Sequence, residues 1–348
     1  MADTTIYRLA LIGFGSAGQG LAQILRSHGD VLERRYGVAL RIVAVCTRSR
    51  GCAYDPDGLE LAALLEAIER DGHLRGLPGA RGWAPLDAIE QAGADVLVEL
   101  TPTDLASGEP ATGHIRAALA KGMHAITANK GPIALHLSEL LQQAADANVY
   151  LGFEGTVMSG TPALRMGWSA LAGCEIQELR GIVNGTTNYI LTQMETGMSY
   201  ADALAEAQRL GYAEADPAGD VEGHDAAAKA AILANVVLNA QLGLDEVERA
   251  GITALMSDAV EDARAAGERW KLLARVWREG DRVRASVRPT RLPLSHPLAG
   301  VAGATNAITF TTDLLGEVTL IGPGAGGVAT GFAVLSDILE LHRLWRQR

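Results

Sequence analysis

The sequence contains few cysteines and few aromatic residues. Among its 348 residues are three cysteines, Cys46, Cys52 and Cys174, and aromatic residues make up 5% of the chain. Three dispersed cysteines cannot form a disulfide framework, and none of them has the CxxC spacing that is typical of zinc sites. The cysteine content therefore excludes a disulfide-rich scaffold, and we expect a reducing, cytoplasmic compartment.

Excess positive charge, long apolar runs and paired histidines are also lacking. The formal net charge is −11, whereas nucleic acids and anionic membranes attract proteins rich in lysine and arginine. No segment has the roughly 18 uninterrupted apolar residues of a membrane-spanning helix, and the N-terminal segment does not resemble a signal peptide. The eight histidines form no HxxxH or HxH pair, which argues against catalytic zinc. We expect a small-molecule substrate, and no nucleic-acid or membrane partner.

Short apolar runs alternate with helical patterns in the first part of the chain. The continuous apolar runs are typical of buried parallel strands. Strands are predicted at 9–12, 40–45, 96–98, 124–127 and 149–151, and helices at 17–26, 115–120 and 137–147. This alternation predicts an α/β fold with a Rossmann-type, doubly wound parallel sheet.

The rest of the chain predicts a second, α+β domain. Strands are predicted at 179–183, 307–310 and 318–321, and helices at 200–210, 225–243 and 258–277. A last helix at 331–344 is expected to return to the first domain. We therefore place the first domain at 1–152, joined by the C-terminal segment 322–348, and the second domain at 153–321.

A glycine-rich motif lies between the first apolar run and the first helical pattern. Gly13, Gly15 and Gly18 have the GxGxxG spacing of dinucleotide-binding proteins, in which they permit a tight turn, approach of a pyrophosphate and close helix packing. The helix N-terminus then offers free N–H groups to phosphates. Glycines that serve only a tight turn are the alternative. We expect the nucleotide to contact Gly13, Phe14, Gly15, Ser16, Ala17 and Gly18.

The end of the second apolar run indicates which dinucleotide is used. A carboxylate at this position would bind the ribose 2′-hydroxyl of NAD, but the sequence after Val45 is Cys-Thr-Arg-Ser-Arg. Arg48 or Arg50 could instead pair with the 2′-phosphate of NADP, because a guanidinium presents fixed donors to phosphate oxygens. We therefore favour NADP(H) over NAD(H). The alternative is that both arginines only solvate a loop.

Acidic residues and a lysine gather at positions 210–229. Asp225 and Lys229 are four positions apart, so on a helix they share one face and place an ammonium beside a carboxylate. Hydride transfer to an aldehyde leaves an alkoxide that needs a proton, and such a lysine can supply it. An ordinary surface ion pair at this spacing is the alternative.

Positions 211–229 resemble the hallmark segment of homoserine dehydrogenases. The segment GYAEADP at 211–217 is followed by Asp220, Gly223, Asp225 and Lys229. Further segments agree with the family in order: GFG at 13–15, TANKGP at 127–132, GIVNGTTNYI at 181–190, and GPGAGG at 322–327 with Thr330. The resemblance implies reversible, NAD(P)H-dependent reduction of L-aspartate 4-semialdehyde to L-homoserine, a reaction of threonine and methionine biosynthesis.

The resemblance also implies roles for individual residues. Lys229 would be the general acid and base, and Lys130 would lie beside nicotinamide and substrate. The second domain would carry catalysis and dimerisation, so we expect a homodimer. The substrate, with its ammonium on the carboxylates, would bind to Glu214, Asp225, Asp220, Thr186 and Gly185. Beyond the glycine-rich motif, the nucleotide would contact Arg48, Thr101, Asn129, Lys130, Gly211 and Gly326.

A monovalent-cation site is implied by the same resemblance at positions 153–162. In the loop FEGTVMSGTP, the side chain of Glu154 and the carbonyls of Val157, Ser159 and Thr161 would bind Na⁺ in a hard, oxygen-only site. A glycine-bearing hinge between the domains is the alternative.

Two other functions are open at this point. One is a related dehydrogenase that acts on another amino-acid carbonyl, because a fold does not fix the substrate. The other is a non-catalytic nucleotide sensor, against which the set Lys130, Glu214, Asp225 and Lys229 argues. The length leaves no room for the C-terminal regulatory domain of longer relatives or for a fused kinase, so we expect no inhibition by L-threonine.

Overall fold

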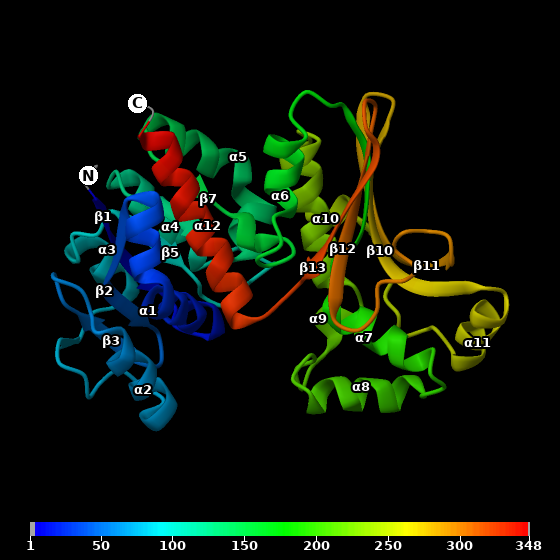
Figure 1. Cartoon of the computed structure of the whole chain (residues 1–348), viewed down its shortest axis with the longest axis horizontal. Coiled ribbons are helices and arrows are strands. Elements are labelled where there is room, and N and C mark those ends of the chain that lie inside the picture. The colour runs from blue at the N-terminus through cyan, green and yellow to red at the C-terminus, as the bar shows by residue number, and fades with distance from the viewer. Residues whose placement is uncertain (1–3, 347–348) are drawn as a thin grey trace. The chain divides into compact units, whose positions relative to one another are not determined.

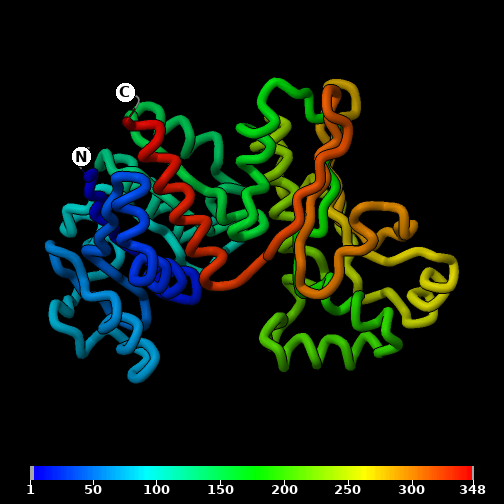
Figure 2. Tube along the Cα trace, viewed as in Figure 1, coloured from blue at the N-terminus to red at the C-terminus, as the bar shows by residue number. Residues whose placement is uncertain are grey.

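The computed structural model describes residues 4–346 and divides the chain into two compact units. The first unit combines the described residues up to Gly160 with those from Gly326 onward, and the second unit is Thr161–Ala325. Figure 2 follows the chain out of the first unit and back into it. The sequence predicts domain boundaries at 152/153 and 321/322, and both lie before the observed boundaries at 160/161 and 325/326.

The first unit is built on a seven-stranded sheet with the order β4-β3-β2-β1-β5-β6-β7. Strands β1, β2, β5, β6 and β7 run parallel, which confirms the predicted α/β fold. Because β2 and β5 flank β1 on opposite sides, a ligand crevice is expected at its carboxyl end. The strands are β1 (Thr5–Ile12), β2 (Val38–Thr47), β3 (Gly51–Tyr54), β4 (Ala80–Arg81), β5 (Val96–Glu99), β6 (His124–Thr127) and β7 (Leu151–Gly152).

Helices connect these strands, and the last helix of the chain packs against the first (Figure 1). Glycines permit this contact, because a Cβ on Gly20 would lie 2.0 Å from the Gly327 carbonyl oxygen, and one on Gly331 would lie 2.4 Å from the Leu21 nitrogen. The helices are α1 (Ser16–Tyr36), α2 (Leu61–Asp71), α3 (Pro85–Gln91), α4 (Ala111–Ala120), α5 (Lys130–Asp146) and α12 (Gly327–Trp345). Within residues 4–346, no helix is both long enough and apolar enough to cross a membrane.

The second unit is built on a six-stranded sheet with the order β13-β12-β8-β10-β11-β9, antiparallel except for the β9–β11 pair. Its strands are β8 (Ile176–Ile182), β9 (Glu248–Arg249), β10 (Glu268–Glu279), β11 (Arg282–Pro293), β12 (Thr305–Thr312) and β13 (Gly316–Pro323). Its α-helices are α6 (Ala163–Arg165), α7 (Gly185–Met194), α8 (Tyr200–Arg209), α9 (Ala218–Val221), α10 (His224–Val237) and α11 (Ser257–Ala265). This is the α+β unit that the sequence predicts.

The helix predicted at 258–277 is wrong in its second half. Helix α11 ends at Ala265, Gly267 adopts a φ of 73°, and the chain from Glu268 forms β10. This strand pairs with β8 on one side and along its whole length with β11 on the other. The sheet satisfies its backbone groups and buries Leu272 and Val276, so tertiary pairing overrides the local helical pattern. The helix predicted at 225–243 likewise ends earlier, at Val237.

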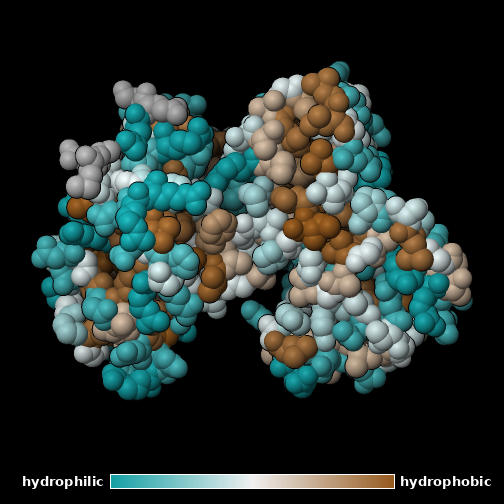
Figure 3. Space-filling view, in the orientation of Figure 1, coloured by the Kyte–Doolittle hydropathy of each residue, from teal (hydrophilic) through white to brown (hydrophobic). Residues whose placement is uncertain are grey.

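The turn between β12 and β13 exposes apolar side chains. Leu314 and Leu315 are 70% and 63% exposed, and Ile321 on the edge strand β13 is 55% exposed. Figure 3 shows hydrophobic residues at this end of the second unit. Exposed apolar side chains along an edge strand are typical of a surface that meets another protein.

Candidate functional site

The glycine-rich loop joins β1 to α1 at the expected crevice. Gly13 has a φ of 99°, and a Cβ there would lie 2.4 Å from the Leu100 carbonyl oxygen, so this position requires glycine. A Cβ on Gly15 would meet nothing within 4 Å, which leaves open space at the start of α1. No side chain of the described residues caps this helix, so its first N–H groups are available to a phosphate. The loop therefore fits the pyrophosphate of a dinucleotide.

Arg48 and Arg50 lie in the turn between β2 and β3. Arg48 is exposed, and within the described part of the chain its guanidinium forms no hydrogen bond. Arg50 donates from Nη1 to the Phe14 carbonyl at 3.3 Å and so contacts the glycine-rich loop, while its backbone N–H donates to the Thr47 hydroxyl at 2.8 Å. The structure leaves Arg48 free to meet a ligand and gives Arg50 a structural contact.

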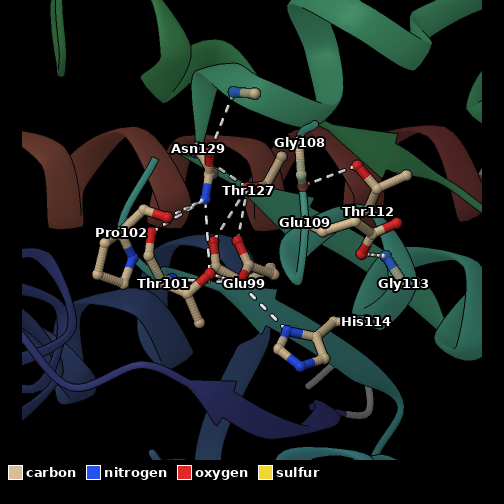
Figure 4. Close-up of polar contacts among 11 residues, drawn as sticks. Glu99, Thr101, Pro102, Gly108, Glu109, Thr112, Gly113, His114, Thr127 and Asn129 are labelled. Carbon is tan, nitrogen blue, oxygen red and sulfur yellow. Dashed lines mark hydrogen bonds and ion pairs between the residues drawn. The ribbon is translucent and has the colours of Figure 1, made fainter. Parts of the chain in front are cut away.

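A buried carboxylate at the end of β5 was not among the predicted site residues. Glu99 is the last residue of β5 and is fully buried. It accepts hydrogen bonds from the hydroxyl and backbone N–H of Thr101, and it lies 3.4 Å from both the Thr127 hydroxyl and His114 Nδ1. Figure 4 shows these groups turned towards the carboxylate. The signal in the sequence was a glutamate directly after the apolar run 96–98.

Asn129 and Lys130 stand at the start of helix α5, directly after β6. Asn129 caps the helix: its Oδ1 accepts from the Gly131 N–H at 3.0 Å, and its Nδ2 donates to the carbonyls of Thr101 at 3.0 Å and Pro102 at 3.3 Å. The structure thus brings Thr101 and Asn129 together, with their side chains bonded to the protein itself (Figure 4). Lys130 is the first residue of α5 and is half-buried.

The remaining glycines assigned to the nucleotide both have positive φ. Gly326 has a φ of 121° and directly precedes α12 in the first unit, where its carbonyl accepts from the Thr330 hydroxyl at 3.0 Å. Gly211 has a φ of 76° and follows α8 in the second unit. Their contacts with a nucleotide stay predictions.

The loop predicted to bind Na⁺ turns sharply. Glu154 is buried, and Met158 and Ser159 have φ values of 56° and 52°. Val157 is buried, while Thr161 is the first residue of the second unit. Within the described residues, no group of three or more His, Cys, Asp or Glu side chains could hold a metal ion. A cation here would therefore depend mainly on backbone carbonyls, as the sequence predicts.

Lys229 and Asp225 form a largely buried ion pair on helix α10. Lys229 is 8% exposed, and its Nζ donates to Asp225 Oδ2 at 2.6 Å and to the Val183 carbonyl, just after β8, at 2.7 Å. Asp225 lies in the first turn of the helix, where the helix dipole favours a negative charge. The alternative of an ordinary surface pair is excluded by this burial. An ammonium has three donors, so one donor of Lys229 is left for a ligand.

Asn184 joins two carboxylates and was missed by the sequence analysis. Its Nδ2 donates to Asp220 Oδ1 at 2.6 Å and to Asp225 Oδ2 at 3.0 Å, while its Oδ1 caps α7 by accepting from the Thr187 N–H at 2.9 Å. Burial raises the pKa of the Asp220 carboxyl above its usual value, as does the charge of Asp225, although the hydrogen bond from Asn184 opposes both effects. The amide therefore holds two like charges together beside the lysine.

Three other residues predicted to bind the substrate lie at the start of α7 and on the loop 210–217. The Thr186 hydroxyl donates to the Tyr212 carbonyl at 2.6 Å and so ties α7 to the loop 210–217. Gly185 permits a close approach, since a Cβ there would lie 2.7 Å from the Ala304 carbonyl oxygen. Glu214 is exposed on the loop, and its carbonyl accepts from a neighbouring glutamine. The structure thus brings together Asp220, Asp225 and Lys229 but not Glu214.

Comparison with known proteins points to one family. Residues 162–339 match the family model for homoserine dehydrogenase, and residues 13–154 match the model for the homoserine dehydrogenase NAD binding domain. The chain is 46% identical over 341 residues to the NAD(+)-dependent homoserine dehydrogenase of Pseudomonas canavaninivorans, covering 97% of each chain. It is 39% identical over 336 residues to the homoserine dehydrogenase of Methanocaldococcus jannaschii, covering 96% of this chain and 98% of that one.

Solved structures agree with the sequence relatives. A homoserine dehydrogenase from Thiobacillus denitrificans has a TM-score of 0.87 at 33% identity, covering 100% of this chain and 75% of that one. A hyperthermophilic archaeal homoserine dehydrogenase in complex with NADPH has a TM-score of 0.84 at 31% identity, covering 98% of both chains. Both similarities extend over the two units of the chain.

The raised pKa of Asp220 predicts a pH-dependent loss of stability. Because the folded chain holds this proton more tightly than the unfolded chain, the stabilising contribution of Asp220 is complete below about pH 4 and is lost as pH rises through the raised pKa. As pH rises from about 4 to about 7, the wild type should therefore lose this contribution while the Asp220→Asn variant does not, so the free energy of unfolding of the variant should rise relative to that of the wild type. Urea unfolding at both pH values measures this gain. Asp216→Asn, which changes an exposed carboxylate of the same segment, is the control, and an equal gain there would contradict the assignment.

Proposed function

Because the chain belongs to the homoserine dehydrogenase family, and is thus an NAD(P)-binding oxidoreductase that interconverts L-homoserine and L-aspartate 4-semialdehyde, we propose that Lys229 carries the proton of this reaction. The bound nicotinamide supplies the hydride. Hydride addition to the aldehyde carbon leaves negative charge on the oxygen, which needs a proton donor. The observation that carries the proposal is the buried Lys229 ammonium, fixed by Asp225 and Val183.

Two fixed acceptors orient the remaining donor of Lys229. With two N–H bonds directed at Asp225 and at the Val183 carbonyl, the third N–H has a defined direction before the substrate binds. In the direction of reduction this N–H protonates the alkoxide. In the direction of oxidation the same amine, after losing a proton, accepts the hydroxyl proton of homoserine.

The carboxylates beside the lysine suit an amino-acid substrate. Asp220 and Asp225 lie close together, and burial and then the charge of Asp225 raise the pKa of Asp220. An ammonium group between the two carboxylates would offset both effects. Glu214 would join them when the loop 210–217 binds the substrate, and Thr186 and Gly185 line the start of α7 nearby. Lys130, the first residue of α5, would place a positive charge beside the nicotinamide and the substrate.

The two alternative functions are not favoured. The family models and the relatives agree on one activity, so a dehydrogenase for another amino-acid carbonyl has no independent support. A nucleotide sensor would have no use for a buried, oriented lysine beside two carboxylates.

Replacing the lysine tests the proton-transfer role. The Lys229→Ala variant should lose about 10²- to 10⁴-fold in kcat, the usual contribution of a general acid, with the fold retained by circular dichroism. The assay follows absorbance of the reduced nucleotide with L-homoserine as substrate. Lys121→Ala removes a lysine that is paired with Glu90 on the surface, and it should leave kcat unchanged. A kcat of Lys229→Ala within about tenfold of the wild type would refute the role.

For the cofactor, we propose a preference for NADP(H). The support is the exposed Arg48 in a turn without a carboxylate at positions 47–50, although one relative is named as NAD(+)-dependent. The Arg48→Ala variant should lose about tenfold or more in kcat/KM for NADPH and little for NADH, because only NADPH carries the 2′-phosphate. Arg50→Ala, which disturbs the contact with Phe14, should affect both nucleotides alike. Clearly higher kcat/KM for NADH in the wild type would contradict the preference.

We also propose that Na⁺ binds to Glu154 and to the carbonyls of Val157, Ser159 and Thr161. The burial of Glu154 and the sharp turn at Met158 and Ser159 support an oxygen-only site. Exchange of Na⁺ for tetramethylammonium should lower the activity of the wild type, and Glu154→Gln should abolish that dependence. Equal wild-type activity in both salts would remove the proposal.

We also propose that the protein is a homodimer and that it is located in the cytoplasm. The exposed apolar residues Leu314 and Leu315 in the turn before β13, with Ile321 on β13 itself, support a contact with a second copy. The three cysteines are free, which supports a reducing compartment. Sedimentation of the purified protein measures the oligomeric state, and fractionation of the source cells measures the location.

A further inference from the structure

We propose that Glu99, with His114 behind it, is a positioning residue for the nicotinamide end of the dinucleotide. The proposal rests on nucleotide binding by the first unit. In doubly wound sheets the dinucleotide lies across the carboxyl ends of the strands, at the place where the strand order reverses. With the adenosine half on the β2 side of β1, the nicotinamide half lies towards β5 and β6. Glu99 ends β5, and Thr127 ends β6.

Burial makes this carboxylate depend on its neighbours. Glu99 has no exposed surface and His114 is 5% exposed, so neither group exchanges hydrogen bonds with bulk water. A buried carboxylate is tolerated only where donors surround it. Thr101 supplies two donors, its hydroxyl and its N–H, while the Thr127 hydroxyl and His114 Nδ1 each lie 3.4 Å away. The network converges on one side chain (Figure 4).

The carboxylate orders two loops through these bonds. The Thr127 hydroxyl donates to Glu99, to its carbonyl at 3.0 Å or its carboxylate, and accepts from the Asn129 N–H at 2.9 Å. The Asn129 amide in turn donates to the Thr101 carbonyl and caps α5. Glu99 therefore fixes both the loop after β5 and the start of the helix that carries Lys130.

This arrangement changes the role expected of Thr101 and Asn129. Both side chains are engaged by the protein, so they hold the backbone at the carboxyl edge of the sheet in place for the nucleotide. Glu99 does not contact the ligand itself and acts only through Thr101 and Asn129. Loss of its acceptor should therefore weaken nucleotide binding more than substrate binding, because the carboxylates proposed to bind the substrate, Asp220 and Asp225, belong to the second unit.

The Glu99→Gln variant tests this directly. It keeps the shape of the side chain but replaces one acceptor oxygen with an NH₂ group. This group faces either the two donors of Thr101 or, in the other rotamer, the Thr127 hydroxyl, so the variant loses an acceptor in both orientations. Fluorescence titration should show Kd values for NADPH and NADH raised about tenfold or more, while KM for homoserine at saturating nucleotide changes less than about threefold. Asp95→Asn makes the same exchange at the amino end of β5, where the carboxylate bonds to Arg8, and should leave the nucleotide Kd unchanged.

Wild-type nucleotide affinity in a folded Glu99→Gln variant would overturn the proposal, as would an equal loss in Asp95→Asn. If Glu99→Gln does not fold, Thr127→Val removes one donor of the network without changing the shape of the side chain. The nucleotide Kd should rise in Thr127→Val and stay at the wild-type value in Thr127→Ser, which keeps the hydroxyl. Failure of either result overturns the proposal. The titration needs no turnover, so an absence of homoserine oxidation in the wild type would refute the proposed function and leave this test intact.

Discussion

The Lys229 ammonium is buried, and a buried charge is stable only where acceptors surround it. Asp225 from the same helix and the Val183 carbonyl at the end of β8 supply these acceptors. The requirement determines how the second unit is assembled, because β8 must end beside the first turn of α10. Asn184 then reaches Asp220 as well as Asp225, so the lysine, both carboxylates and the cap of α7 form one bonded set.

The first unit also contains a buried polar side chain that needs partners. Its buried carboxyl group, on Glu99, accepts hydrogen bonds at the ends of β5 and β6, where the parallel sheet stops and its loops are held in place. In each unit a polar cluster joins the ends of neighbouring elements, in addition to the apolar contacts of the core. Such clusters have few ways to satisfy all their bonds, which makes the geometry around them specific.

The sequence predicted the features that depend on neighbouring residues. Strand β6 lies at 124–127, where the alternation of strand and helix patterns predicts it, and the turn at Gly13 has the positive φ that its motif requires. Features that depend on distant residues were missed. Asn184 bonds to carboxylates 36 and 41 positions away, and strand β10 is stabilised by partners elsewhere in the chain, so no local spacing could reveal either.

Helix α12 comes last in the chain, yet it completes the core of the first unit. Val334, Ile338 and Leu341 belong to the same apolar cluster as Leu9 and Leu21. During synthesis on the ribosome, the second unit emerges as one uninterrupted segment, whereas the first unit must wait for these final turns. The unit that begins to form first is therefore completed last, and the apolar face of α1 is open to aggregation or to a chaperone until the C-terminal helix has been made.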